Sequence, residues 1–265
     1  MTALKRVMAG IVLAVLLAGC ADEADEVQET AAPGVPQNVN IVSIGDSLTE
    51  GVGDSTDSGG YVPYLEYQLE SLDEIKEASF VNYGKRGNRT NQLIKRLEQA
   101  EIQADIKKAD IVIITIGGND VVKVVKENWS HLTVDTFEKE EDGYAERIHT
   151  VLEEIRAINE DAGIVLVGIY NPFGRIFVDT EDDEMIVRTW NERAEEVAAS
   201  FEQTVFVSVE TIFGEGSDGL FFEDQFHPND IGYEQMAGRI FDTINGAPLE
   251  ELTNQKIVIS NEGSN

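Results

Sequence analysis

The sequence contains little cysteine and little positive charge. Cys20 is the only cysteine among 265 residues, so no disulfide can form within one chain. Lysine and arginine together number 20, against 50 aspartates and glutamates, and the formal net charge is −30. This balance excludes nucleic-acid binding, because phosphate contacts require basic surface. It also disfavours electrostatic docking to anionic lipid or wall polymers.

Other signatures are missing as well. We find no internal repeat, no group of residues with metal-ligand spacing and no cofactor motif, so we expect neither a metal nor a cofactor. The Gly-x-Ser-x-Gly pattern of α/β-hydrolases is absent. Any serine hydrolase chemistry therefore has to come from a different arrangement of motifs.

The N-terminus predicts export and lipid anchoring. Lys5 and Arg6 precede an apolar stretch, residues 7–18, that is too short to span a bilayer comfortably, so residues 1–19 resemble a signal peptide. Leu17-Ala18-Gly19-Cys20 resembles the lipobox of bacterial lipoproteins. The alternative is an ordinary signal peptide with an incidental cysteine. We expect Cys20 to be lipidated, which anchors an extracytoplasmic protein to the bacterial cell membrane.

The rest of the chain predicts one domain. Residues 20–38 are acidic, with two prolines and no helical or strand period, which indicates a flexible tether. Residues 39–247 suffice for one well-cored domain. Residues 248–265 are expected to be a C-terminal tail or an added edge strand.

Apolar runs alternate with amphipathic segments in this domain. We expect strands at residues 40–45, 79–83, 110–116, 163–170 and 204–209. Helical patterns occupy residues 61–72, 92–103, 143–159, 183–201 and 229–245, whereas residues 128–141 are the least regular stretch. This alternation predicts an α/β fold, a three-layer α/β/α sandwich around a parallel sheet.

A serine follows the first predicted strand. The apolar run ends abruptly in Gly45-Asp46-Ser47, which indicates a sharp strand-to-helix turn. Open α/β folds place their active sites at the carboxyl ends of the strands. Ser47 is therefore a candidate nucleophile.

Three histidines can be compared as its general base. His227 follows Asp224 by three residues in a predicted turn, where the carboxylate can accept the imidazole Nδ1–H and leave Nε2 to take a proton. Glu146 and His149 have the same spacing inside a predicted helix, where such pairs are most often solvated surface pairs. His131 has no acid at that offset. We therefore expect His227, oriented by Asp224, to be the base.

Two more strand ends are rich in glycine. Gly117 and Gly118 follow the most apolar strand and let backbone approach a ligand, while Asn119 offers a neutral N–H₂ donor. Gly87 follows another strand, and its N–H could face the same site. Taken alone, each stretch is also compatible with an ordinary glycine-rich turn.

Four blocks now stand in order: Gly45-Asp46-Ser47-Leu48, Gly87-Asn88-Arg89-Thr90, Gly117-Gly118-Asn119-Asp120, and Asp224 with His227. They resemble the SGNH hydrolases, also called the GDSL lipase/esterase family, over about residues 40–245. The resemblance implies a flavodoxin-like, five-stranded parallel sheet, Ser47 as nucleophile and His227 as base, positioned by Asp224. It also implies an oxyanion hole made by the backbone N–H groups of Ser47 and Gly87 and the side chain of Asn119.

The chain departs from the family beside Gly87, where the family commonly has a small residue and this chain has Arg86. With Lys85 and Arg89 it forms a basic group, which either attracts an anionic substrate or merely covers surface. Tyr170 ends the fourth strand and either lines the substrate pocket or belongs to a plain turn. Loops 53–60 and 172–183 would shape that pocket.

The expected function is hydrolysis of carboxylic esters through an acyl-enzyme, as in a carboxylesterase or lysophospholipase. The first alternative keeps this chemistry but removes acetyl groups from cell-wall or extracellular polysaccharide. The second is a binding lipoprotein without turnover. The substrate is an ester of a small molecule, lipid or glycan, and the sequence does not define the oligomeric state.

Overall fold

The computed structural model describes residues 35–128, 133–171, 181–214 and 216–259, and the structural statements below refer to these residues. One five-stranded sheet runs through them in the order β2-β1-β3-β4-β5, and every pairing is parallel. The strands are β1 (Gln37–Gly45), β2 (Ile75–Gly84), β3 (Ile111–Thr115), β4 (Gly163–Val167) and β5 (Thr204–Val207). The predicted flavodoxin-like α/β/α fold is confirmed.

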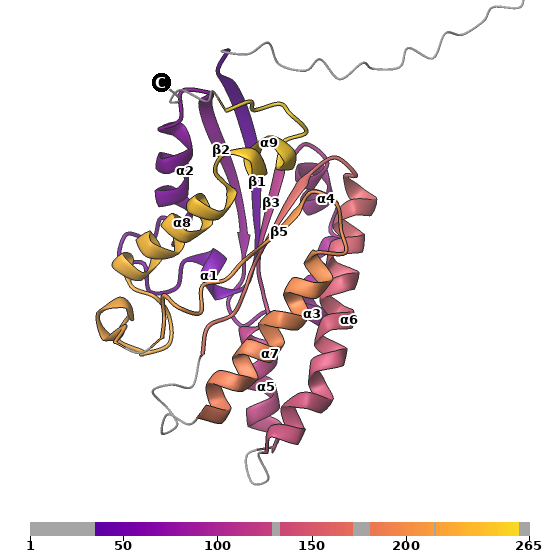
Figure 1. The fold of residues 1–265 in the computed structure, drawn as a ribbon, viewed down its shortest axis with the longest axis vertical. Helices are drawn as coiled ribbons and strands as arrows, with labels where there is room; N and C mark the ends of the chain where they lie inside the picture. The colour runs from indigo at the N-terminus through magenta and orange to yellow at the C-terminus, as the bar shows by residue number, and fades with distance from the viewer. Residues whose placement is uncertain (1–34, 129–132, 172–180, 215, 260–265) are drawn as a thin grey trace, which may run out of the picture.

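Helices cover both faces of the sheet (Figure 1). One layer is formed by α3 (Thr90–Leu97), α4 (Ala100–Ile106), α5 (Gly118–Asn128), α6 (Val134–Ile158) and α7 (Glu181–Ala198). The other is formed by α2 (Val62–Glu70), α8 (Asp230–Ile244) and α9 (Ala247–Leu252). The short helix α1 (Ser47–Glu50) directly follows β1, and a 3₁₀ turn, η1, spans Asp218–Leu220.

The central strands carry apolar side chains to both layers. Every residue of β3 and β4 is buried. Val112 and Ile114 of β3 point into the core under α3 to α7, whereas Ile111 and Ile113 point into the core under α2 and α8. An uninterrupted apolar run is expected of a parallel strand that is covered on both sides.

Three segments differ from the sequence expectations. The helix predicted at residues 92–103 is two helices, α3 and α4, which are separated at Glu98 and Gln99. The stretch 128–141 is not irregular where it is described, because α6 begins at Val134 and places Phe137 in the core. Helix α5 was not expected, since its valines follow a Gly-Gly-Asn sequence that by itself indicates a turn.

The segment expected to be a C-terminal tail or edge strand is part of the domain as far as residue 259. It forms α9, and no strand follows within its described residues. Ile257 is buried, and the Lys256 Nζ lies 2.8 Å from both carboxylate oxygens of Asp110. These contacts fasten the segment to the amino-terminal edge of the sheet.

The candidate active site lies at the opposite, carboxyl edge, where β1 separates β2 from β3 and the strand order reverses. No helix among the described residues is long and apolar enough to cross a membrane. The predicted signal peptide, Cys20, His131 and residues 172–180 of the predicted pocket loop lie outside the described residues.

Candidate active site

Ser47 is the first residue of α1, at the end of β1. Gly45 allows this turn because a Cβ there would lie 2.0 Å from the carbonyl oxygen of Thr115. Asp46 caps the helix by accepting a hydrogen bond from the Leu48 N–H at 3.1 Å. The residue Ser47 is only 4% exposed. The sharp strand-to-helix turn thus holds the hydroxyl at the carboxyl edge of the sheet.

A line of hydrogen bonds joins this serine to the distant Asp224-x-x-His227 block. The His227 Nε2 lies 2.9 Å from the Ser47 Oγ, and its Nδ1 lies 2.6 Å from the Asp224 Oδ2. The second carboxylate oxygen, Oδ1, accepts the backbone N–H groups of Phe226 and His227 at 3.0 and 2.9 Å. The structure therefore brings together the three residues predicted as nucleophile, base and orienting acid.

The charge of Asp224 follows from these contacts. Burial by itself would raise the pKa of its carboxyl, but hydrogen bonds from the His227 ring and from two backbone N–H groups lower the pKa below its ordinary value. An ionised Asp224 can only accept, so the Nδ1 of His227 carries the proton. The Nε2 lone pair is then free to accept the proton of Ser47.

The rival histidine lies elsewhere. His149 is exposed on α6, and its Nδ1 lies 3.3 Å from the Glu153 carboxylate rather than beside Glu146. It also contacts the Phe201 ring edge-on, with ring centroids 5.0 Å apart. His149 thus belongs to a solvated surface pair, as expected of a histidine on an exposed helix face, although its partner is Glu153 and not Glu146.

Of the three donors expected to form an oxyanion hole, Ser47 and Asn119 line the same cavity, and Gly87 follows the end of the neighbouring strand β2. Within the described part of the chain, the backbone N–H groups of Ser47 and Gly87 make no hydrogen bond. Gly87 has φ +75°, a conformation that favours glycine. The Asn119 side-chain nitrogen donates to the carbonyl of Asn88 at 3.0 Å, which leaves its second hydrogen available. All three groups thus have an N–H available, and their joint role as an oxyanion hole stays a prediction from the family resemblance.

A buried network that sequence reasoning missed connects these two donor segments. Asp120, only 5% exposed, accepts hydrogen bonds from the Thr90 N–H at 3.0 Å and from its hydroxyl at 2.6 Å. The Arg147 guanidinium reaches the same carboxylate at 3.4 Å and the Thr90 hydroxyl at 2.6 Å. This network ties the start of α3, after Gly87, to the start of α5, after Asn119. Its members are at least 27 residues apart, so only the fold shows the connection.

Asp46 also received no role from the sequence, although it belongs to the first motif. It is buried, and its Oδ1 accepts the Thr115 hydroxyl at 3.0 Å. Burial raises the pKa of the Asp46 carboxyl to about 7, since the hydrogen bonds from Leu48 and Thr115 oppose that shift only in part. The Asp46 carboxylate thus joins the Leu48 backbone, next to the nucleophile, to Thr115 on β3, so Asp46 positions Ser47.

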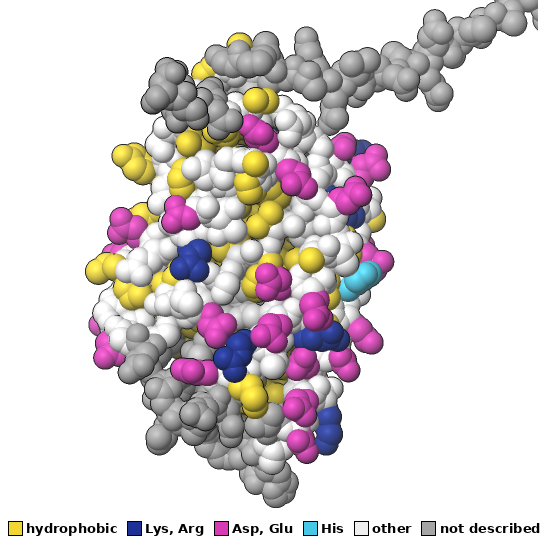
Figure 2. Space-filling view, viewed as in Figure 1, with side chains coloured by type: hydrophobic (Ala, Val, Ile, Leu, Met, Phe, Trp, Pro, Cys, Tyr) yellow, Lys and Arg dark blue, Asp and Glu magenta, His cyan; other side chains and the backbone are white. Residues whose placement is uncertain are grey.

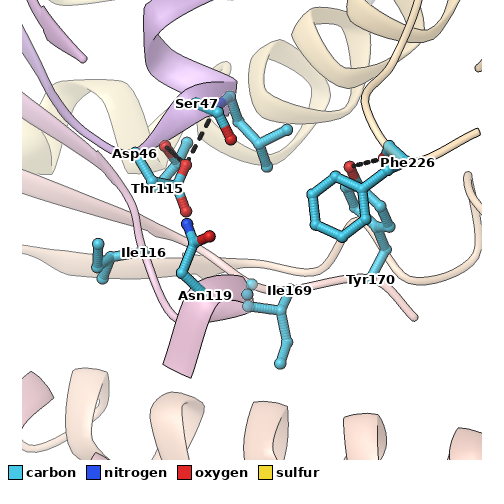
Figure 3. A pocket seen from close by; sticks show the side chains of 11 residues that line it. Asp46, Ser47, Thr115, Ile116, Asn119, Ile169, Tyr170 and Phe226 are labelled. Carbon is cyan, nitrogen blue, oxygen red and sulfur yellow. Dashed lines mark hydrogen bonds between the residues drawn. The ribbon is translucent and has the colours of Figure 1, made fainter. Parts of the chain in front are cut away.

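A small cavity opens beside Ser47 between the ends of β1, β3 and β4 (Figure 3). Asp46, Ser47, Thr115 and Asn119 line one side, and Ile169, Tyr170 and Phe226 line the other. Tyr170 is buried, and its hydroxyl donates to the carbonyl of Phe226 at 2.7 Å. Tyr170 is therefore a wall of the pocket and a support for the loop that carries His227.

Of the basic residues beside Gly87, one is paired with a carboxylate and two form no ion pair among the described residues. Arg86 pairs with Glu50, the last residue of α1: its Nε lies 2.8 Å from the carboxylate, and its backbone N–H also donates to it. Lys85 and Arg89 form no ion pair with a carboxylate in the described chain, and Arg89 is partly buried. Since Glu50 neutralises Arg86, Arg89 and Lys85 are left as the cations for an anionic group.

No group of three or more histidine, cysteine or carboxylate side chains that could hold a metal ion occurs among the residues that the structure describes. The loop 53–60, expected to shape the pocket, is organised around Asp54. Its carboxylate accepts hydrogen bonds from Thr56, Ser58 and Gly60. The loop packs against the His227 segment, because a Cβ on Gly53 would meet the carbonyl oxygen of Pro228 at 2.4 Å.

Comparison with known proteins identifies the family. Residues 43–235 match the family model described as the GDSL-like Lipase/Acylhydrolase family. The chain is 34% identical over 251 residues to the uncharacterized protein YpmR of Bacillus subtilis, covering 92% of this chain and 97% of that protein. It is 27% identical over 210 residues to the spore germination lipase LipC of Bacillus licheniformis, covering 76% of this chain and 94% of that protein.

Solved structures share the fold. The lipase Lip_vut3 from a goat rumen metagenome superimposes with a TM-score of 0.70 at 24% identity, covering 79% of this chain and 99% of that one. The acetylxylan esterase Axe2 of Geobacillus stearothermophilus gives a TM-score of 0.58 at 21% identity, covering 81% and 97%.

Proposed function

Because the chain belongs to the GDSL-like lipase/acylhydrolase family and is a carboxylic ester hydrolase, we propose that Ser47, His227 and Asp224 cleave the ester in two steps. The hydrogen-bonded line from Asp224 through His227 to Ser47 is the observation that carries this proposal. It joins a nucleophile to a base and the base to an orienting acid, as nucleophilic catalysis requires.

In the first step the Ser47 oxygen attacks the carbonyl carbon while the Nε2 of His227 takes the hydroxyl proton. The negative charge moves to the carbonyl oxygen, where the N–H groups of Ser47 and Gly87 and the Asn119 amide can stabilise it. Collapse of this intermediate breaks the ester bond, and His227 returns the proton to the departing alcohol. An acyl group is then bound to Ser47.

In the second step water attacks the acyl-enzyme, with His227 again accepting a proton. The acid is released as Ser47 recovers its hydrogen. Asp224 stays ionised throughout and stabilises the imidazolium that forms twice in the cycle. The two steps require only the ester, water and the side chains named here.

Labelling distinguishes this proposal from a binding protein without turnover. A fluorophosphonate probe should modify the domain stoichiometrically, and p-nitrophenyl butyrate should be hydrolysed, because both reactions use an activated serine. A correctly folded domain that neither reacts with the probe nor turns over any ester would contradict the proposal.

Two substrate classes have support. Lipid acyl esters, including lysophospholipids, are supported by the similarity to LipC, which is named a lipase. Acetyl esters of cell-wall or extracellular polysaccharide are supported by the small cavity beside Ser47. Comparing acetylated glycan with lysophospholipid as substrates would separate the two, since only one should be turned over efficiently.

We expect Arg89, rather than Arg86, to recognise an anionic group of the substrate. Acidic side chains are spread over the face seen in Figure 2, so an unpaired cation beside the site is favourable for an anion. Replacing Arg89 with alanine should raise KM about fivefold or more for an anionic ester and leave KM unchanged for a neutral one. The double replacement Arg86→Ala with Glu50→Gln is the control, because it removes both charges of an ion pair and leaves the net charge unchanged. Equal effects of Arg89→Ala on both esters would reject this role.

The anchor at Cys20 and the extracytoplasmic location are also part of the proposal, supported by the lipobox-like sequence. Gln37, where β1 begins, lies at the edge of the sheet opposite Ser47, so a tether attached there leaves the site unobstructed (Figure 1). In the producing bacterium, Cys20→Ser should shift the protein from the membrane to the soluble fraction. Unchanged membrane association would contradict lipidation.

A further inference from the structure

The cavity beside Ser47 is small. Its volume is about 30 Å³, which leaves room for about two to three water molecules. Apolar side chains form much of its surface, and Ile116, Ile169 and Phe226 are among them. An apolar hollow that adjoins a nucleophile and the oxyanion donors is suited to the acyl chain of an ester.

The wall formed by the residues that follow β4 is fixed by buried hydrogen bonds. Asn191 of α7 is buried and contacts Ile169 twice: its side-chain oxygen accepts the Ile169 N–H at 2.9 Å, and its nitrogen donates to the Ile169 carbonyl at 2.8 Å. Gly168 lies beneath the same amide, because a Cβ there would meet the Asn191 oxygen at 2.8 Å. A substrate cannot displace this backbone without breaking both buried hydrogen bonds.

Phe226 forms the opposite wall of the cavity. Its ring lies in the hollow between Ser47 and Tyr170 in Figure 3, and it meets the His227 ring edge-on with centroids 4.8 Å apart. The Tyr170 hydroxyl holds the Phe226 carbonyl at 2.7 Å. Tyr170 in turn packs on Phe213, with ring centroids 4.4 Å apart. The aromatic layer behind Phe226 is thus already filled.

We propose that the site accepts short acyl groups, of about two to four carbons, and that Phe226 is the residue that sets this limit. The inference rests on the proposed function and adds the acyl length to it. A longer chain has to displace the Phe226 ring or leave its methylenes in water. The alcohol part of the ester, which departs first, is not restricted by this pocket.

The test is a series of p-nitrophenyl esters with acetyl, butyryl and octanoyl groups, each below its aggregation limit. For the unmodified domain we expect kcat/KM for octanoate to be at least about tenfold below that for butyrate. Phe226→Ala should raise the octanoate-to-butyrate ratio of kcat/KM by about tenfold or more. Phe222→Ala is the matched control, since this exposed phenylalanine lies in the same loop and does not line the cavity.

Each outcome is decisive for the acyl limit. Preference for octanoate in the unmodified domain, or an unchanged ratio in Phe226→Ala, would overturn the proposal. If Phe226→Ala fails to fold, Ile169→Ala enlarges the same cavity from the other wall and should shift the ratio in the same direction. Fluorophosphonate labelling keeps the two proposals apart: a labelled enzyme with long-chain preference rejects only the acyl limit, whereas absent labelling and turnover reject the proposed function.

Discussion

Replacing Ser47 with alanine should lower kcat for p-nitrophenyl butyrate by at least about 10⁴-fold and abolish fluorophosphonate labelling. The reason is geometric: the Ser47 oxygen is the atom that faces the His227 Nε2 at 2.9 Å. Without that oxygen no acyl-enzyme can form, and only the oxyanion donors and binding remain to assist water. Initial rates and probe labelling measure the change.

The same variant should fold normally. Among the described residues, the side chain of Ser47 makes one hydrogen bond, to His227, and a neutral hydrogen bond contributes only about 1 kcal/mol to stability. The midpoint temperature of thermal unfolding should therefore change by no more than a few degrees. Ser58→Ala, in the neighbouring loop, controls for loss of a hydroxyl and should keep full activity. If Ser47→Ala retains turnover while Ser58→Ala loses it, the nucleophile has been wrongly assigned.

Replacing Asn119 with alanine should lower kcat about 10²- to 10³-fold with little change in KM. Its amide can stabilise negative charge that appears only in the transition state, which corresponds to about 3 kcal/mol. Substrate binding in the ground state does not depend on that charge, so the loss is confined to kcat.

Asn128→Ala provides a control on the same helix, because Asn128 lies at the far end of α5, where its side chain donates to the carbonyl of Val124. It should leave both constants unchanged. Should Asn119→Ala instead raise KM at constant kcat, Asn119 would be a substrate-binding residue and not an oxyanion donor. Its bond to the Asn88 carbonyl means that a stability measurement has to accompany the kinetics.

The sequence predicted the main strands and the fold because their signals are local. The uninterrupted apolar run of β3 and the Gly45-Asp46-Ser47 turn each depend on neighbouring residues, as does the three-residue spacing of Asp224 and His227. The segments it misjudged lack such signals. Helix α6 extends to Val134 through a mostly polar stretch in which Phe137 supplies the core contact. Helix α9 begins inside the sequence Gly246-Ala247-Pro248, which by itself indicates a turn.

The ion pair between Arg86 and Glu50 could not be predicted from the sequence either. Its partner Glu50 is 36 residues away and reaches it only because β2 lies beside β1, which brings the end of β2 onto α1. Nothing in the sequence around Arg86 distinguishes it from Arg89. The sheet register therefore changes which of the two arginines is available to an anion.

By itself, the sequence determined the order of the strands along the chain, the residue types at their carboxyl ends and the excess of negative charge. Tertiary structure alone decided the 2.9 Å contact between Ser47 and His227 across 180 residues, the burial that raises the pKa of Asp46, and the small cavity that Phe226 lines. The physical reason is that hydrogen-bond distances, desolvation and cavity size depend on how separate elements pack, whereas turns and apolar runs depend on neighbours in the chain.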